Sequence, residues 1–164
     1  MQKNGVHAVP YTNGRLFDFL PKKGNDTTGR PLTCSESIAA WKADNADQFA
    51  CGREGCPTCY QFYAEGYNQR TFAVMDPSTD YWQQKVANRT RTIAQTYGAD
   101  GVYIDQVTAT FPELCVQANK GGAGAQWTQG TRSLLERSIE AAGPEKLILS
   151  ESNAEAYIGT VPGS

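Results

Sequence analysis

Two short apolar runs that each end in a carboxylate constrain the fold of this chain more than any other feature. The first, Val102-Tyr103-Ile104, follows Gly101 and stops at Asp105, and the second, residues 146–150, stops at Glu151. An apolar run bounded by turn residues is typical of a buried strand in a parallel sheet. Both acids would then lie at the carboxyl edge of the sheet, where (β/α) barrels carry their active sites. The alternative for Asp105 is a strand-end aspartate that caps a turn.

The order of the expected elements favours a parallel α/β fold. Strands are expected at 6–11, 71–76, 102–105 and 146–151, and helices at about 80–97 and 128–142. Repeated strand–helix units with near-continuous apolar strands indicate a parallel sheet. A whole barrel needs eight strands and typically ~250 residues. The predicted fold class is therefore α/β, a partial TIM-type (β/α) barrel of about four parallel strands with helices.

Each expected helix has one apolar side at helical spacing. The first stripe consists of Trp82, Val86, Thr90, Ile93, Ala94 and Tyr97, and the second of Leu134, Leu135, Ser138, Ile139 and Ala142. Ser78 or Thr79 is expected to cap the first helix, and Gly98 to end it. These stripes are expected to pack against the strands.

A long polar stretch at about 17–69 is expected to form an inserted loop or small subdomain within a single 1–164 domain. It holds four of the five cysteines, Cys34, Cys51, Cys56 and Cys59, and the fifth is Cys115. The C-x4-C-x2-C spacing and Cys34 could supply four thiolates to a structural zinc ion. A disulfide and free thiols remain equally open alternatives. No cofactor is required by the motifs of the chain.

Composition narrows the classes of partner. The formal net charge is −2 and the pI is near 5.4, so no basic face for nucleic acid is expected. No run approaches the ~18 apolar residues of a membrane span, and residues 1–5 lack the apolar region of a signal peptide. A soluble protein is expected, and its localisation stays open.

Two carboxyl groups that face each other at one sheet edge are the catalytic groups that most glycoside hydrolases use. An ionised Asp105 would attack the anomeric carbon, while Glu151 with a raised pKa would protonate the leaving oxygen. Asp76, at the end of a third expected strand, would bind a sugar hydroxyl or form the turn that enters the next helix. His7 is the only histidine and is not expected to act as a base.

Three segments carry a resemblance to a known family: residues 11–15, residues 98–106 and residues 150–158. They resemble the barrel core of a glycoside-hydrolase-like family of unknown function that is similar to the endo-α-N-acetylgalactosaminidases. The resemblance implies a (β/α)8 barrel in which Asp105 is the nucleophile and Glu151 the acid/base. It also implies a pocket lined by Tyr11, Asn13, Gln106 and Trp127, with Glu155 as a reserve acid. The chain departs from the family in having no histidine in the loop after the Asp105 strand.

The sequence therefore predicts a retaining glycoside hydrolase, or a catalytic-core fragment of one, that acts on a carbohydrate substrate. The alternative is a non-catalytic carbohydrate-binding or degenerate barrel stapled by the cysteine cluster. In either case a partial barrel leaves open sheet edges, and these favour self-association.

Overall fold

The structure is a computed structural model that describes residues 5–18, 52–53, 56–60, 62–65, 70–109, 125–151, 157 and 159–160. Predictions for Cys34, Cys51, Cys115 and Glu155 therefore lie outside the described residues. Backbone contacts divide the chain into two units, and each is described by itself. Among its described residues, the first unit holds 5–15, 76–109 and those from 125 onward, and the second holds the rest.

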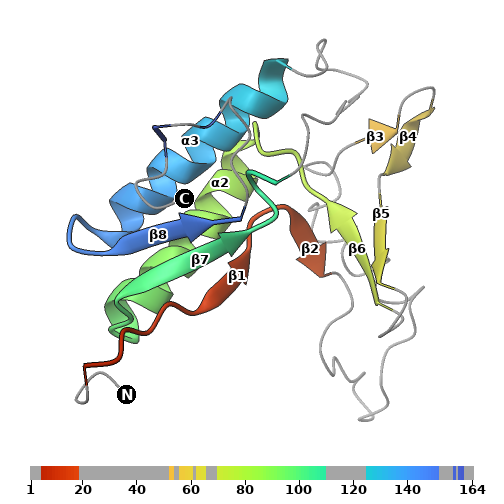
Figure 1. Ribbon diagram of the computed structural model, residues 1–164. Helices are drawn as coiled ribbons and strands as arrows, with labels where there is room; N and C mark the ends of the chain where they lie inside the picture. Colours follow the sequence, from red (N-terminus) through yellow and green to blue (C-terminus); the bar gives the residue numbers. More distant parts are fainter. Residues whose placement is uncertain are drawn as a thin grey trace, which may run out of the picture. The chain divides into compact units, whose positions relative to one another are not determined.

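A three-stranded parallel sheet forms the centre of the first unit (Figure 1). Its strands are β1 (Tyr11–Asn13), β7 (Gly101–Asp105) and β8 (Leu147–Ser150), in the order β1-β7-β8. Asn13 lies opposite Asp105 in the β1–β7 pair, and Ile104 lies opposite Ser150 in the β7–β8 pair. The predicted strands that end in Asp105 and Glu151 are thus neighbours, and both run in the predicted direction.

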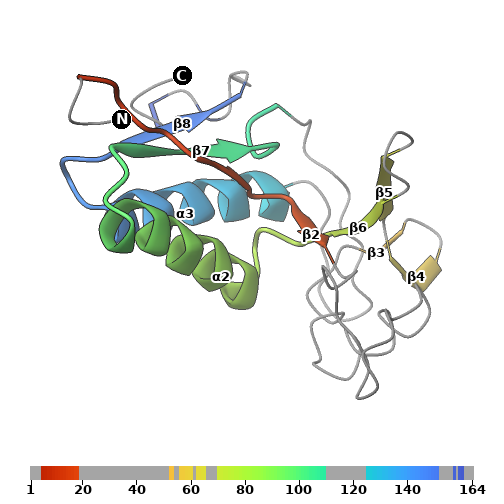
Figure 2. The ribbon, with the colours of Figure 1, turned by 90° about the horizontal axis from the view of Figure 1, so that it is seen from below.

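Two helices cover one face of this sheet, as Figure 2 shows. Helix α2 (Asp80–Arg91) continues into a π-helical turn, η3 (Thr92–Thr96), and α3 (Ala125–Ala142) connects β7 to β8. Gly130 brings α3 close to the turn before α2, because a Cβ there would lie 2.4 Å from the backbone nitrogen of Ser78. None of the described helices is long and apolar enough to cross a bilayer.

The core of the first unit lies between the helices and the sheet. Fully buried side chains come from both predicted helical stripes and from the strands, namely Trp82, Val86, Thr90, Leu134, Leu135, Val102, Ile104 and Ile148. The prediction for Tyr97 is wrong, since this side chain is 77% exposed. The π turn explains the error, because an extra residue per turn rotates the positions after it away from the stripe.

Helix α3 begins before its predicted start at Thr128. Ala125, Gln126 and Trp127 already belong to it. Trp127 was expected to reach a pocket from a loop, but it lies in the first turn of α3 and is only 3% exposed. Its indole nitrogen has no hydrogen-bond partner among the described residues.

The second unit contains antiparallel strands. Strand β6 (Arg70–Val74) pairs with β2 (Leu16–Asp18) and β5 (Phe62–Glu65), and β3 (Gly52–Arg53) pairs with β4 (Cys56–Tyr60). The prediction of a fourth parallel strand at 71–76 is therefore wrong, since β6 makes antiparallel pairs. Apolar composition predicts that a strand is buried but not the direction of its neighbours, which is why the sequence misled here.

Candidate active site

The two carboxylates meet at the carboxyl edge of the parallel sheet. Asp105 is the last residue of β7, and Glu151 follows Ser150, the last residue of β8. Because Ile104 is paired with Ser150, the residues that follow them, Asp105 and Glu151, come next to each other at the ends of the two strands. Two hydrogen bonds fix this register, one from the Ser150 hydroxyl to the Ile104 carbonyl at 2.8 Å and one from the Thr108 hydroxyl to the Ser150 hydroxyl at 2.9 Å.

Asp105 is buried, with 8% of its surface exposed, and it is held from β1. The Tyr11 hydroxyl donates to Asp105 Oδ2 at 2.7 Å, and Asn13 Nδ2 lies 3.4 Å from the same oxygen. The backbone N–H of Gly14 donates to the Asp105 carbonyl at 3.0 Å. Strand β1 therefore contacts the side chain of Asp105, and Gly14, which follows β1, contacts its backbone.

Glu151 is partly exposed and lies close enough to Asp105 for a side-chain hydrogen bond. This hydrogen bond is the main reason why the pKa of Glu151 is raised, and burial and the charge of Asp105 raise it further. Because two adjacent carboxylates repel each other when both are ionised, this arrangement favours one proton between the two groups. The Tyr103 hydroxyl donates to Glu151 Oε2 at 3.4 Å, which opposes the rise.

Tyr103 completes the cluster, although the sequence predicted it only as part of a strand. Its pKa is raised first by burial and then by the nearby charges of Glu151 and Asp105. The rings of Tyr103 and Tyr11 lie 6.1 Å apart, tilted by 34°. The alternation of side chains along a strand was the signal that could have found Tyr103, because it lies two residues before Asp105 and shares its face.

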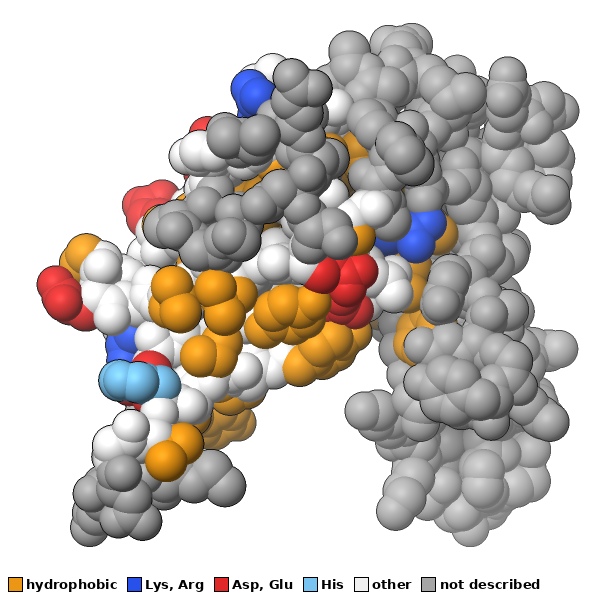
Figure 3. Space-filling model, viewed as in Figure 1, with side chains coloured by type: hydrophobic (Ala, Val, Ile, Leu, Met, Phe, Trp, Pro, Cys, Tyr) orange, Lys and Arg blue, Asp and Glu red, His pale blue; other side chains and the backbone are white. Residues whose placement is uncertain are grey.

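Figure 3 shows this face of the sheet, which lies opposite the helices. Apolar side chains gather over the strands, and acidic side chains lie beside them at the strand ends. Tyr11 is 60% exposed on this part of the molecule. An aromatic surface next to a pair of carboxylates is suited to the apolar face and the glycosidic oxygen of a sugar.

The remaining predicted site residues are distributed as follows. Gln106 has a left-handed backbone (φ 61°), and its Oε1 accepts from Arg15 Nη1 at 3.4 Å. Asp76 is buried in the turn before α2, where its Oδ1 accepts from the Ser78 backbone at 2.8 Å and from the Ser78 hydroxyl at 2.6 Å. Gln106, a non-glycine residue held at positive φ next to the candidate nucleophile Asp105, has the kind of backbone strain that clusters at functional sites.

No group of three metal-ligating side chains occurs within the part of the chain that the structure describes. Cys56 and Cys59 lie on β4, but their side chains are not described. His7 is exposed at the opposite edge of the sheet, with Nδ1 3.8 Å from Asp100 Oδ2. The structure brings no histidine to Asp105 and Glu151 among the described residues.

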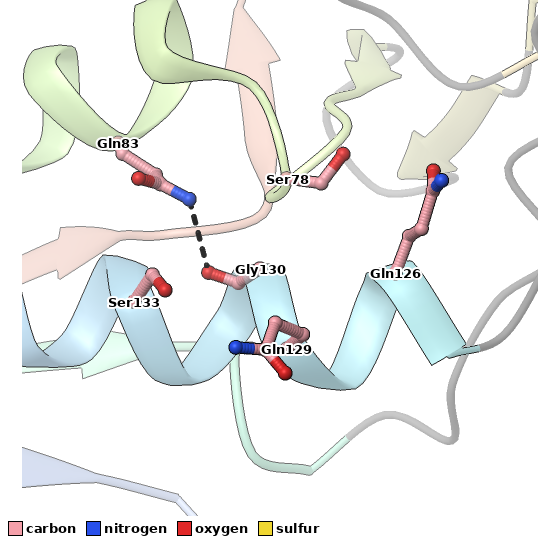
Figure 4. A pocket seen from close by; sticks show the side chains of 6 residues that line it. All are labelled: Ser78, Gln83, Gln126, Gln129, Gly130 and Ser133. Atoms are coloured by element: carbon pink, nitrogen blue, oxygen red, sulfur yellow. Dashed lines mark hydrogen bonds between the residues drawn. The ribbon is translucent and has the colours of Figure 1, made fainter. Parts of the chain in front are cut away.

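A separate hollow of about 320 Å³ lies between α2 and α3 (Figure 4). The described residues that line it are uncharged, namely Ser78, Gln83, Gln126, Gln129, Gly130 and Ser133. Gln83 reaches across it and donates to the Gly130 carbonyl at 3.4 Å. The described part of this lining therefore supplies neither a carboxylate nor an imidazole for acid–base chemistry.

Comparison with known proteins gives a family and two curated relatives. The model of the domain of unknown function DUF6259 matches residues 1–162. "Putative glycoside hydrolase 22789" of Monosiga brevicollis is 31% identical over 167 residues, which cover 99% of this chain and 13% of that protein. "Putative glycoside hydrolase" of Bacteroides thetaiotaomicron is 27% identical over 162 residues, which cover 96% of this chain and 21% of that protein. The chain thus spans only a small part of the length of either relative.

Solved structures share the fold at low sequence identity. An α-galactosidase from Thermus thermophilus in complex with stachyose has a TM-score of 0.60 and 17% identity, covering 99% of this chain and 28% of that one. The glycoside hydrolase domain of PelA variant E218A from Pseudomonas aeruginosa has a TM-score of 0.56 and 13% identity, covering 98% and 50%. At such identities the likeness concerns the fold alone, a parallel sheet with helices as in these barrel-like proteins.

Proposed function

This chain belongs to the DUF6259 family, and from that starting point we propose that it is the catalytic core, or a part of the core, of a retaining glycoside hydrolase. Asp105 is the nucleophile and Glu151 the general acid/base. The observation that carries the proposal is the hydrogen-bonded pair of carboxyl groups at the carboxyl ends of β7 and β8. The names of the two curated relatives support the same reaction class.

The proximity of the two groups favours retention over inversion. An inverting enzyme keeps its carboxyl groups ~6.5–9.5 Å apart so that a water molecule fits between sugar and base. A retaining enzyme needs only ~5–5.5 Å, because the carboxylate itself attacks. The interaction with Asp105 that raises the pKa of Glu151 requires the two groups to lie close together, which favours the shorter spacing of a retaining pair.

The reaction proceeds in two steps. In the first, an Asp105 oxygen bonds to the anomeric carbon, the bond to the leaving oxygen breaks, and the Glu151 proton moves to that oxygen. In the second, ionised Glu151 takes a proton from water, the water oxygen replaces the Asp105 ester, and Asp105 is released as a carboxylate. The raised pKa of Glu151 keeps it protonated for the first step.

We propose an α-linked hexoside as substrate. The support is the α-galactosidase among the structures of similar fold, together with the cycloalternan-degrading enzyme of Trueperella pyogenes in complex with isomaltose, which has a TM-score of 0.56, 14% identity and coverage of 95% of this chain and 21% of that one. The resemblance to endo-α-N-acetylgalactosaminidases adds an N-acetylgalactosaminide. Tyr11, Asn13 and Gln106 lie near Asp105 and remain candidates for sugar contacts, whereas buried Asp76 and Trp127 are weaker ones.

The test is hydrolysis of aryl α-galactosides, α-glucosides and α-N-acetylgalactosaminides by the purified protein. Asp105→Asn and Glu151→Gln are each expected to lower kcat by at least about 100-fold, while Glu140→Gln, on the exposed side of α3, makes the same chemical change with no effect. Proton NMR of the first product is expected to show the anomer of the substrate. Hydrolysis that survives in Asp105→Asn would refute the assignment, and sugar binding without turnover would favour the binding-module alternative.

The open edges of the described sheet bear on assembly. Strands β1 and β8 have only one neighbour each among the described strands, and Tyr11 and Leu147 are exposed near them. We propose that further strands, from a second copy or from additional sequence, cover these edges. Sedimentation velocity tests this, and a monodisperse monomer at all concentrations would contradict self-association.

For the cysteines we propose either a structural zinc ion or a disulfide among Cys34, Cys51, Cys56 and Cys59. Plasma mass spectrometry and thiol titration of the purified protein separate the alternatives. About one zinc per chain supports the metal, while loss of two or more titratable thiols without zinc supports the disulfide. Five titratable thiols would remove both.

A further inference from the structure

The two carboxyl groups of the candidate site do not receive the same hydrogen bonds. Asp105 Oδ2 accepts from Tyr11 at 2.7 Å and lies 3.4 Å from Asn13 Nδ2. Glu151 Oε2 has the longer bond from Tyr103, at 3.4 Å. A hydrogen-bond donor stabilises a carboxylate more than a carboxylic acid, so the group with the shorter and more numerous donors is the one that stays ionised.

The β1 donors are themselves held in position. Asn13 Oδ1 accepts from the Arg15 backbone at 2.9 Å, which turns the Asn13 amino group toward Asp105. Arg89 of α2 binds the Asn13 carbonyl at 3.3 Å, and the Tyr11 hydroxyl lies 3.2 Å from Asn13 Nδ2. A donor whose direction is fixed in advance costs no reorganisation when charge develops next to it.

The arrangement also distinguishes the two oxygens of Asp105. Tyr11 and Asn13 both contact Oδ2. An oxygen that accepts two donors is a poorer nucleophile than its partner, because those bonds must weaken before it attacks. Oδ1 receives neither of these two hydrogen bonds.

We infer that Tyr11 is a positioning residue that makes Asp105 the ionised member of the pair and thereby leaves the shared proton on Glu151. Asn13 assists it on the same oxygen. This inference rests on the proposed function for its catalytic meaning, but the position of the proton is a property of the free protein. It assigns to Tyr11 a role different from that of a residue lining the sugar pocket.

The protonation order tests the inference without any substrate. Among the residues that the structure describes, the titratable and charged groups that contact the pair or its donors are Tyr11 from β1, Arg15 after β1, Arg89 from α2 and Tyr103 from β7. In protein labelled with 13C at the carboxyl carbons of Asp and Glu, lowering the pH is expected to shift the Glu151 signal before that of Asp105. In Tyr11→Phe the two signals are expected to shift together or in the reverse order.

Two matched variants serve as controls. Tyr103→Phe removes the donor to Glu151 and is expected to preserve the order, with Glu151 protonated first. Tyr97→Phe makes the same change at an exposed position and is expected to alter neither signal. Protonation of Asp105 first in the unmodified protein, or an order that Tyr11→Phe does not change, overturns the inference.

Kinetics separate positioning from sugar binding. If the protein hydrolyses a glycoside, Tyr11→Phe is expected to lower kcat by about 10- to 100-fold with little change in KM, the size expected for loss of a hydrogen bond to a charged group. A rise in KM at unchanged kcat would make Tyr11 a substrate contact and overturn the inference. If no glycoside is cleaved, the proposed function fails while the NMR result still decides the role of Tyr11.

Discussion

Gly14, which follows β1, is hydrogen-bonded to the end of β7, and there is no space for a side chain at its position. Its N–H donates to the Asp105 carbonyl at 3.0 Å, and its carbonyl accepts from the Trp82 indole at 2.7 Å. A Cβ at this position would lie 2.3 Å from Cγ1 of Val107 and 2.7 Å from Cγ2 of Ile104. Ordinary contact begins near 3.4 Å, so Gly14→Ala demands a movement of roughly 1 Å in a close-packed region.

The expected cost follows from these contacts. Overpacking of a buried position destabilises by about 1–3 kcal/mol, and replacing glycine by alanine returns about 0.4–1 kcal/mol through the unfolded chain. Gly14→Ala is therefore expected to lower the free energy of unfolding by about 1–2 kcal/mol, and the Tm by ~2–8 °C for a chain of this size. Urea denaturation followed by tryptophan fluorescence measures it, since Trp82 bonds directly to Gly14.

A double-mutant cycle identifies the clash as the cause. Val107→Ala removes the atom that the new Cβ meets, so the double variant is expected to be more stable than the sum of the single effects by at least about 0.5 kcal/mol. Glu136→Ala, on the exposed side of α3, is expected to change stability by less than about 0.5 kcal/mol. Unchanged or increased stability of Gly14→Ala, or strict additivity in the cycle, would refute the reasoning.

Three further predictions concern buried or titrating groups. Because the pKa of Glu151 is raised on folding, its contribution to stability is present below its unfolded pKa and is lost as the pH rises through the folded pKa. The free energy of unfolding of the unmodified protein should therefore fall with rising pH more steeply than that of Glu151→Gln. Parallel curves of the two proteins against pH would contradict this. Thr90 is fully buried with no partner for its hydroxyl among the described residues, so Thr90→Val is expected to stabilise by up to ~1 kcal/mol in urea denaturation. Trp127→Ala is expected to cost about 3–5 kcal/mol in the same assay, and a loss below about 1 kcal/mol would contradict its burial.

The sequence predicted β7, β8, α2 and α3 because each has a strong local signal. It misplaced the first strand, since β1 (Tyr11–Asn13) begins where the expected strand at 6–11 ends. The predicted apolar stripe of α2 is confirmed at Trp82, Val86 and Thr90, which are all buried, because helical spacing alone decides which side of a regular helix faces the core. It failed at Tyr97, because a π turn changes the spacing and leaves no mark in the apolar pattern. The prediction for β6 was wrong for a different reason. Its sequence indicates burial, but its pairing with β2 and β5 depends on residues distant in sequence.

The sequence could predict at which edge of the sheet the candidate site lies, but not which of its side chains contact one another. Parallel strands carry their carboxyl ends to the same side, so the sequence could bring Asp105 and Glu151 to one edge. Their hydrogen bond depends on the register of β7 against β8, which brings Ile104 level with Ser150. That register is set by packing and by the hydrogen bonds of Thr108 and Ser150, and no motif encodes it.

The difference between the two carboxyl groups follows from the strand order itself. Strand β7 lies between β1 and β8, so Asp105 has a neighbouring strand on each side, and β1 supplies the donors Tyr11 and Asn13. Strand β8 has β7 as its neighbour within the described sheet, so Glu151 takes its hydrogen bond from Tyr103 on that side. Among the described residues Asp105 thus has more donors than Glu151, and this asymmetry supports a nucleophile on β7 with an acid on β8. If Glu151 were the nucleophile and Asp105 the acid, Glu151 would need equally strong hydrogen-bond donors from a strand beyond β8. The proposed assignment therefore requires that any strand next to β8 in a larger assembly gives Glu151 fewer donors than β1 gives Asp105.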